Sequence, residues 1–384
     1  MKKKVCVVIT ARPSYSRIKT ALLALAKNEA IELQVVAAAS ALLDRYGTAV
    51  HTIERDGLKI ARSVFMVLEG DHPTTMAKTT GLGTLELASA FNDLRPDMVV
   101  TVADRYETMA TAIAAAYMNI PLIHVQGGEV TGNIDEKVRH AITKLADLHL
   151  VSSNKARDRV IRMGENPDSV VVTGCPSIDL ALPVIKEASL SFSPFERYGG
   201  VGPQSDLSNG YVIVMQHPVT TEHTVARAQV LETLEAISEL DLPCLWFWPN
   251  VDAGADGTSK GIRAFRESRS PQRIHFFMNA SPEDFLRILF HSRCLVGNSS
   301  AGIREAAFLG VPVVNIGSRQ NGRDRGANVY DVESGRVEIL RAVCSQIAHG
   351  RYPSDDLYGN GRAGENIAKA IADWAPTFTK TLPY

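Results

Sequence analysis

The fold of this chain follows from residues 98–125, MVVTVADRYETMATAIAAAYMNIPLIHV. Two short apolar runs, 98–103 and 120–125, flank an alanine-rich stretch, 105–118, that predicts a helix. Apolar strands that alternate with helices are typical of a parallel sheet covered on both faces. Pro121 stands at the start of the second run, where a missing backbone N–H costs little. The stretch therefore predicts one βαβ unit of an α/β domain.

The same alternation continues in both directions from this unit. In the first half it predicts strands at 4–10, 31–38, 148–152 and 169–174, and helices at 15–28, 78–94, 135–146 and 154–163. In the second half it predicts strands at 211–216, 243–248, 273–276, 293–296 and 312–316, and helices at 222–239, 257–267, 281–291, 302–309 and 335–348.

The alternation is interrupted once, at residues 189–210, which are rich in Ser, Pro, Gly, Asn and Gln and predict an inter-domain linker. We expect two Rossmann-like, doubly wound α/β domains, over 1–188 and 211–361, that face a cleft. A last helix within 362–384, at about 362–374, is expected to pack back on the first domain. Doubly wound domains bind ligands at the carboxyl ends of their strands, so the loops there are the candidate sites.

Composition excludes several kinds of partner. Among the 384 residues, 41 Lys and Arg stand against 42 Asp and Glu, which argues against a nucleic-acid surface or a polybasic membrane anchor. No stretch reaches the ~18 apolar residues of a membrane span, and the N-terminal apolar run is too short for a signal peptide. The five cysteines are scattered without a C-x-x-C pair. We expect a cytoplasmic protein with reduced thiols.

Motifs for common cofactors are also missing from the sequence. No G-x-x-x-x-G-K-[ST] loop occurs, and Gly81-Leu82-Gly83 lacks both the third glycine and the preceding strand of a dinucleotide fingerprint. The histidines lack metal-ligand spacing, and Asp252 and Asp256 are four residues apart rather than a close acidic pair. The sequence predicts a site without metal or cofactor.

Polar side chains follow the strands of the first half. The loop after 4–10 carries Arg12 and Ser16, which suit a phosphate, or else Ser16 caps a helix. Asp104-Arg105 follows 98–103 and is either functional or a helix cap. The loop after 120–125, Gln126-Gly127-Gly128-Glu129 onward, leads into Asp135 and Arg139, which share a helix face and could simply form an ion pair.

The second half repeats this arrangement. His217 follows the strand 211–216 and Asn250 follows 243–248; a lone histidine of this kind is more often structural. Ser299 and Ser300 open a helix after 293–296, which suits a diphosphate. Glu305, about one turn later, could accept hydrogen bonds from ribose hydroxyls. Arg319, after 312–316, adds a cation beside them.

Together these loops resemble those of the hydrolysing UDP-N-acetylglucosamine 2-epimerases of sialic acid biosynthesis, nearly end to end. The stretches that carry the resemblance are Ala103-Asp104-Arg105, Gly127-Gly128-Glu129-Val130-Thr131-Gly132, Ile134-Asp135, Arg139-His140-Ala141-Ile142-Thr143-Lys144-Leu145, Gly174-Cys175-Pro176-Ser177, Gln216-His217-Pro218-Val219-Thr220-Thr221, Pro249-Asn250-Val251-Asp252-Ala253-Gly254, Gly297-Asn298-Ser299-Ser300, Arg319-Gln320 and Gly322-Arg323.

The resemblance implies a GT-B-like fold, a UDP-sugar substrate and a homodimer or homotetramer. It implies that the reaction eliminates UDP from C1 and the proton from C2, and that water adds to 2-acetamidoglucal to give N-acetylmannosamine. The residues it implies for UDP binding are Arg12, Ser16, Asn250, Ser299, Ser300, Glu305 and Arg319. The residues it implies for catalysis are Asp104, Asp135 and His217, supported by Arg105 and Arg139, with Glu129 and position 126 in the acid–base loop.

One residue departs from the family pattern. Gln126 stands where the family usually has a carboxylate, and an amide cannot take up a proton in that role. Glu129 or Asp104 could cover the task, or the substrate could be a UDP-2,4-diacetamido-2,4,6-trideoxy sugar of legionaminic acid synthesis, or activity is lost. A non-hydrolysing epimerase, a GT-B glycosyltransferase and a silent UDP-sugar-binding protein are the other hypotheses.

Overall fold

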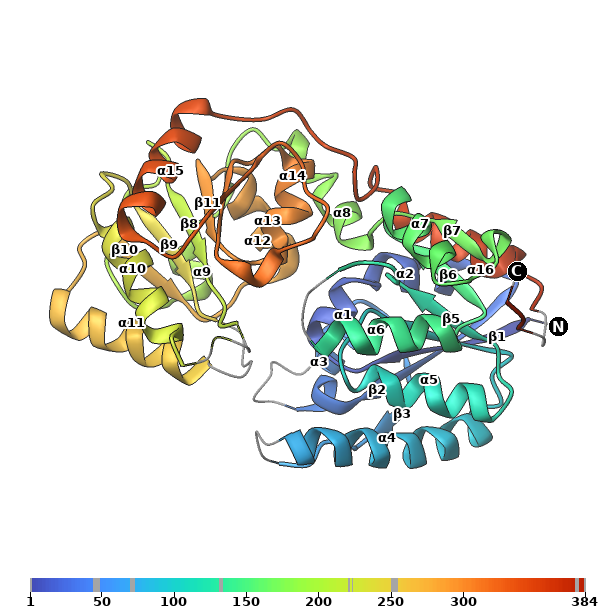
Figure 1. Cartoon of the computed structure of the whole chain (residues 1–384). Helices are drawn as coiled ribbons and strands as arrows, with labels where there is room; N and C mark the ends of the chain where they lie inside the picture. The colour runs from blue at the N-terminus through green and yellow to red at the C-terminus, as the bar shows by residue number, and fades with distance from the viewer. Residues whose placement is uncertain are drawn as a thin grey trace. The chain divides into compact units, whose positions relative to one another are not determined.

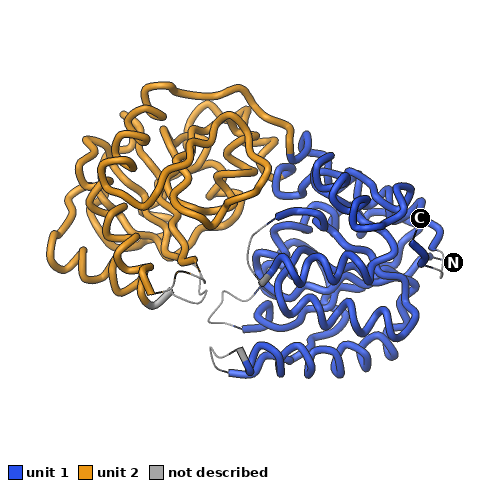
Figure 2. Tube along the Cα trace, viewed as in Figure 1, with its two compact units in different colours: residues 1–130, 134–179, 358–384 blue, residues 131–133, 180–357 orange. Residues whose placement is uncertain are grey.

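The computed structural model describes residues 2–43, 49–69, 73–130, 134–219, 222, 224–249, 255–376 and 380–382. The chain divides into two units, each with its own parallel sheet (Figure 2). Unit 1 comprises Met1–Val130, Ile134–Asp179 and Tyr358–Tyr384, and the main part of unit 2 is Leu180–Leu357. Two parallel-sheet α/β units are the fold class that the sequence predicts.

Unit 1 is built on a seven-stranded sheet in which every neighbouring pair is parallel. Its strands, in spatial order, are β3 (Ile60–Val64), β2 (Ile31–Ala38), β1 (Lys3–Ile9), β4 (Met98–Val102), β5 (Leu122–Val125), β6 (Leu148–Val151) and β7 (Val170–Val172). The order reverses between β1 and β4, as in a doubly wound Rossmann-like sheet.

Helices cover both faces of this sheet (Figure 1). They are α1 (Arg12–Ser16), α2 (Lys19–Lys27), α3 (Ala49–Arg55), α4 (Pro73–Leu94), α5 (Thr108–Tyr117), α6 (Ile134–Leu145), α7 (Asn154–Arg162), α8 (Pro176–Ala181) and α16 (Ala363–Asp373). In β1, Val5 and Val7 pack in one core with Leu22 of α2, whereas Cys6 and Val8 pack in the other with Phe91 of α4. This period of two explains why the strand is apolar throughout.

The last helix, α16, lies against α2 within unit 1. Ile367 and Ile371 join the same core as Leu22. Gly364 allows the close approach, since a Cβ there would lie 2.6 Å from the carbonyl carbon of Thr20.

Unit 2 has a six-stranded parallel sheet of the same winding order. Its strands, in spatial order, are β10 (Ile274–Phe277), β9 (Cys244–Phe247), β8 (Val212–Met215), β11 (Cys294–Gly297), β12 (Val313–Ile316) and β13 (Val329–Val332). Its helices are α9 (Pro194–Tyr198), α10 (Ala226–Ser238), α11 (Ala255–Arg269), α12 (Pro282–Phe290), α13 (Ser300–Ile303), α14 (Glu305–Leu309) and α15 (Arg336–His349).

Two strands escaped the sequence prediction, and both are edge strands. Most residues of β3 and β13 are exposed or half-buried, so neither shows a continuous apolar run. Two helix predictions also change: 15–28 becomes α1 and α2, and 302–309 becomes α13 and α14, which are separated at Arg304.

Residues 189–210, where the sequence predicts a linker, belong to unit 2 in the structure. Val201 exchanges both backbone hydrogen bonds with Phe276 of β10, and the hydroxyl of Tyr198 donates to Asp284 at 2.5 Å. The polar, glycine-rich composition of 189–210 is that of an irregular segment that packs on unit 2. The unit boundary lies at Asp179, ahead of the predicted one. Within the described ranges, no helix is both long and apolar enough to cross a bilayer.

Candidate functional site

Two turns at the carboxyl ends of the unit 1 strands hold non-glycine residues in the left-handed region. Ala103, after β4, has φ of 63°, and Gln126, after β5, has φ of 67°. Such a conformation costs free energy for a residue with a Cβ and is found where the surrounding structure imposes it. Both turns lie directly beside the predicted acid–base residues Asp104 and Glu129.

Asp104, Glu129 and Arg139 form a buried cluster in unit 1. Their exposed fractions are 6%, 5% and 1%. Arg139, on α6, donates from one guanidinium nitrogen to the Asp104 carboxylate and from the other to the backbone carbonyl of Glu129 at 2.8 Å. Arg17 lies 3.6 Å from the second Asp104 oxygen. Two guanidinium groups stabilise the ionised form of this carboxylate.

Glu129 and Gln126 are each held by a further polar side chain. The Ser152 hydroxyl donates to Glu129 Oε1 at 2.8 Å. The Gln126 amide donates to Cys175 Sγ at 3.1 Å, and it is 1% exposed. Its Oε1 is buried and has no hydrogen-bond partner in the part of the chain that the structure describes. Gln126 therefore offers an acceptor rather than a proton.

The other predicted residues of unit 1 lie on α1, in the loop before α5 and on α6. Arg105 forms an ion pair with Glu107 at 3.1 Å, which leaves its side chain 37% exposed. Asp135 lies in the first turn of α6, one turn before Arg139. Arg12 begins α1, and its carbonyl accepts a hydrogen bond from the Ser16 hydroxyl at 3.4 Å. Burial lowers the pKa of Arg12.

In unit 2, His217 is fixed through its backbone by Asn298. The His217 N–H donates to Asn298 Oδ1 at 2.7 Å, and the Asn298 amide donates to the His217 carbonyl at 2.9 Å. Gly297 allows the two turns to meet, because a Cβ at its φ of 129° would lie 2.2 Å from the Met215 carbonyl oxygen. Burial, followed by the positive charge of Arg319, lowers the pKa of His217 to about 3.

The remaining residues of unit 2 surround the turn after β11. Arg319 and Gln320 both donate to the Asn298 carbonyl, at 3.1 and 2.8 Å. Ser299 caps α13, which Ser300 begins. Glu305 begins α14, and its Oε2 is buried without a hydrogen-bond partner among the described residues. Asn250 lies outside the residues that the structure describes.

Four residues that contact predicted residues of their own unit, or a direct neighbour of one, were not themselves predicted as site residues: Arg17, Ser152 and His124 in unit 1, and Asn298 in unit 2. Arg17 and Ser152 follow strands in the sequence, so the strand-end rule could have included them. His124 is buried within β5, and its contacts have no sequence signal. Asn298 directly follows β11, so the strand-end rule applies to it as well, but its bond to the backbone of His217, after the neighbouring strand β8, could not be predicted.

The buried histidines make stability depend on pH. Burial lowers the pKa of both His124 and His217 to about 3, from 6.5. Below pH 6.5 the unfolded chain takes up protons that the folded chain does not, so the free energy of unfolding should fall. We expect a loss of about 2 kcal/mol per histidine between pH 7 and pH 5. Above pH 6.5 neither group contributes.

Urea unfolding of the wild type and His217→Gln at both pH values checks this expectation. The variant should lose less stability on acidification than the wild type, by the amount that one histidine contributes. His51→Gln is the matched control, because the His51 side chain is 74% exposed. An equal loss in all three proteins would contradict the assignment of buried, neutral His217.

Comparisons with known proteins identify the family of this chain. Residues 23–372 match the family model described as UDP-N-acetylglucosamine 2-epimerase. The chain is 30% identical to a UDP-N,N'-diacetylbacillosamine 2-epimerase (hydrolyzing) of Legionella pneumophila, over 100% of this chain and 97% of that protein. It is 32% identical to the polysialic acid biosynthesis protein P7 of Escherichia coli, over 89% of this chain and 85% of that one.

Solved structures show the same fold. The UDP-GlcNAc 2-epimerase of Neisseria meningitidis, in a crystal structure bound to UDP-GlcNAc, superposes with a TM-score of 0.79 at 20% identity, over 96% of this chain and 99% of that one. The family model spans both units, and the first of these relatives matches the whole chain. This chain is a member of the UDP-N-acetylglucosamine 2-epimerase family.

Proposed function

We propose that the protein is a hydrolysing 2-epimerase that converts UDP-N-acetylglucosamine and water to N-acetylmannosamine and UDP. The observation that carries the proposal is the buried cluster of Asp104, Glu129 and Arg139. Two hydrolysing relatives, from Legionella pneumophila and Campylobacter jejuni, support the hydrolytic outcome at 30% and 29% identity.

In the proposed reaction, a base removes the C2 proton while the bond from C1 to the UDP oxygen breaks. The product is 2-acetamidoglucal. Water then adds across the double bond. Its hydroxyl group bonds to C1, and a proton adds to C2 on the face opposite the one from which the first proton was removed. UDP leaves with the bonding electrons, so atoms and charge balance.

We assign Asp104 as the base. The C2 proton is weakly acidic, so its removal needs a positioned carboxylate in its ionised form. Arg17 and Arg139 hold Asp104 in this form. Glu129 and Asp135 are the remaining acid–base candidates. Arg105 and Arg139 support them, and Gln126 contributes a hydrogen-bond acceptor.

We assign the unit 2 residues to the leaving nucleotide. Departure of UDP leaves negative charge on its diphosphate, which the Arg319 guanidinium, the His217 imidazole and the Ser299–Ser300 turn can stabilise. Glu305 has an unpartnered buried oxygen, which suits the ribose hydroxyls. Asn250 is the remaining residue that we assign to UDP in this part of the chain, and from unit 1 we assign Arg12 and Ser16.

The alternative substrate to UDP-N-acetylglucosamine is UDP-N,N'-diacetylbacillosamine, a UDP-2,4-diacetamido-2,4,6-trideoxy sugar. The observation that favours it is Gln126, whose buried Oε1 can accept a hydrogen bond where the family usually has a carboxylate. The relative from Legionella pneumophila, which this chain matches over its whole length, carries that substrate in its name.

NMR of the purified protein with each UDP-sugar in D₂O tests the proposal. Free 2-epimeric sugar with deuterium at C2, together with UDP, is the expected result. A product that keeps its UDP would point to a non-hydrolysing epimerase. Binding of both nucleotides without turnover would overturn the proposal in favour of a binding protein or a transferase.

Glu305→Ala should weaken UDP binding by about 10- to 100-fold, because hydrogen bonds to a carboxylate are lost. Calorimetry with UDP and 2'-deoxy-UDP measures the effect. The wild type should prefer UDP, and the variant should lose most of that preference. Glu338→Ala, at an exposed position on α15, is the control. Unchanged discrimination in Glu305→Ala would contradict the ribose assignment.

A further inference from the structure

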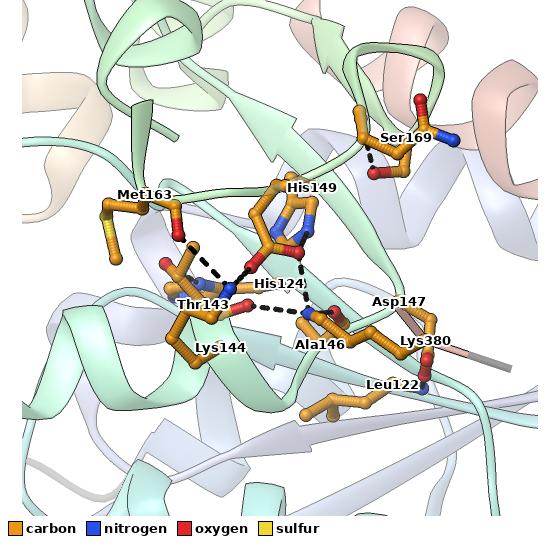
Figure 3. A network of polar contacts seen from close by, with 12 residues as sticks. Leu122, His124, Thr143, Lys144, Ala146, Asp147, His149, Met163, Ser169 and Lys380 are labelled. Carbon is orange, nitrogen blue, oxygen red and sulfur yellow. Dashed lines mark hydrogen bonds and ion pairs between the residues drawn. The ribbon is translucent and has the colours of Figure 1, made fainter. Parts of the chain in front are cut away.

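His124 is a fully buried histidine that connects two parts of the unit 1 cluster. Its Nε2 lies 2.9 Å from the Ala103 carbonyl oxygen. Its Nδ1 lies 3.1 Å from Thr143 Oγ1, which Figure 3 shows with His124. A carbonyl only accepts, so Nε2 must carry the proton and donate it. Nδ1 is then the acceptor, and the Thr143 hydroxyl donates to it. Burial keeps the ring neutral by lowering its pKa to about 3.

The two partners of His124 are adjacent to the proposed acid–base residues. Ala103, held in the left-handed region, directly precedes Asp104. Thr143 follows Arg139 by four residues on α6, so the two side chains share a helix face. A continuous hydrogen-bonded chain therefore runs from the turn that carries Asp104, through β5, to the helix that carries Arg139.

The adjacent glycine loop leaves room for this chain of hydrogen bonds. A Cβ on Gly127 would lie 3.0 Å from both His124 Nδ1 and Thr143 Oγ1. A side chain at that position would press on the hydrogen bond between them. The buried contact between His124 and Thr143 therefore favours glycine at position 127.

The carboxyl end of α6 is anchored separately. Glu165 accepts from Lys144 and Lys380, each at 2.6 Å, and contacts His149 at 3.0 Å. Lys380 also donates to the carbonyls of Thr143, at 3.3 Å, and Ala146 (Figure 3). The Thr143 hydroxyl adds a contact one turn earlier on α6, toward Arg139.

We propose that His124 and Thr143 are positioning residues, which hold Asp104 and Arg139 in the arrangement that the reaction needs. The inference rests on the proposed function for its kinetic test. Asp104 and Arg139 are already in contact, so the chain through His124 acts on their orientation. Small displacements of a catalytic group lower the rate of the chemical step more than they lower ground-state binding.

Thr143→Val tests this role, because it removes the hydroxyl and keeps the shape. We expect kcat to fall about tenfold, with KM and UDP affinity within about twofold of the wild type. Thr143→Ser keeps the donor and should recover most of kcat. Thr111→Val, on α5, is the matched control, since Thr111 Oγ1 is buried without a hydrogen-bond partner in the described part of the chain.

The combination of results separates positioning from stability. Melting temperatures of the three variants report any loss of packing. A Thr143→Val protein that stays folded with wild-type kcat would overturn the proposal. So would a Thr143→Ser protein as slow as Thr143→Val, because the hydroxyl would then be irrelevant.

A second measurement does not depend on turnover. Nitrogen-15 NMR of histidine-labelled protein, with His124→Gln to assign the signals, should show protonated Nε2 and unprotonated Nδ1 in His124. The opposite tautomer would overturn the inference even in an active enzyme. If neither UDP-sugar is turned over but this tautomer is found, the proposed function has failed and the hydrogen-bonded chain stands.

Discussion

Replacing Asp104 by asparagine is expected to lower kcat by roughly 10²–10⁴-fold while UDP affinity stays unchanged. Asparagine keeps the size of the side chain and an oxygen that can accept from Arg139. It cannot accept the C2 proton. Single-turnover kinetics with the UDP-sugar, and calorimetry with UDP, measure the two quantities separately.

The matched control is Asp158→Asn on α7, whose side chain is exposed. It should have wild-type kinetics. If Asp104→Asn also keeps the wild-type rate, the base is a different carboxylate, and Glu129→Gln and Asp135→Asn become the informative variants. Deuterium incorporation at C2 in D₂O should be lost in step with turnover, since both require removal of that proton.

Much of the fold could be predicted because the central strands are buried on both faces. Such strands read as continuous apolar runs, as 98–103 and 120–125 do. β3 and β13 lie at sheet edges, where partly exposed residues interrupt the run. The prediction of a linker at 189–210 is wrong. Polar, glycine-rich composition indicates an irregular backbone, but it does not indicate the unit on which that backbone packs.

The sequence predicts which residues belong to the candidate site more readily than it predicts which of them contact each other. Asp104, Glu129 and His217 are predicted because they follow strands of a doubly wound sheet, where ligands bind. The sequence offered Asp135 as the ion-pair partner of Arg139, four residues away. The structure also brings Arg139 into contact with Asp104 and with the Glu129 carbonyl, which lie on other elements. Such pairings depend on how α6 lies on the sheet, which local spacing does not encode.

The contact of Asn298 also could not be predicted from the local sequence. Its sequence context suggested a polar turn at a helix start. Its side-chain amide instead replaces a backbone strand pairing, because it both accepts from and donates to the main chain of His217. The backbone of His217 is thus held by a residue 81 positions away in the sequence.

Replacing Arg139 by methionine should produce the largest loss of stability in unit 1. It leaves the buried Asp104 carboxylate with Arg17, at 3.6 Å, as its resolved cationic neighbour, and it leaves the Glu129 carbonyl without this donor. Breaking a buried ion pair by removing one partner costs about 3–5 kcal/mol. Hydrogen exchange of the slowest amides in β4 and β5 reports the effect on this unit alone.

The double variant Asp104→Asn/Arg139→Met separates the cost of an unpaired charge from the cost of lost packing. Most of the penalty in Arg139→Met comes from a carboxylate that must stay ionised or take up a proton in a buried place. Asparagine has no such charge, so the double variant should be more stable than Arg139→Met. If Arg139→Met costs the same in both backgrounds, the coupling between the two residues is zero. The stabilising role of Arg139 would then lie in its hydrogen bond to the Glu129 carbonyl, and Asp104 would keep its charge through Arg17.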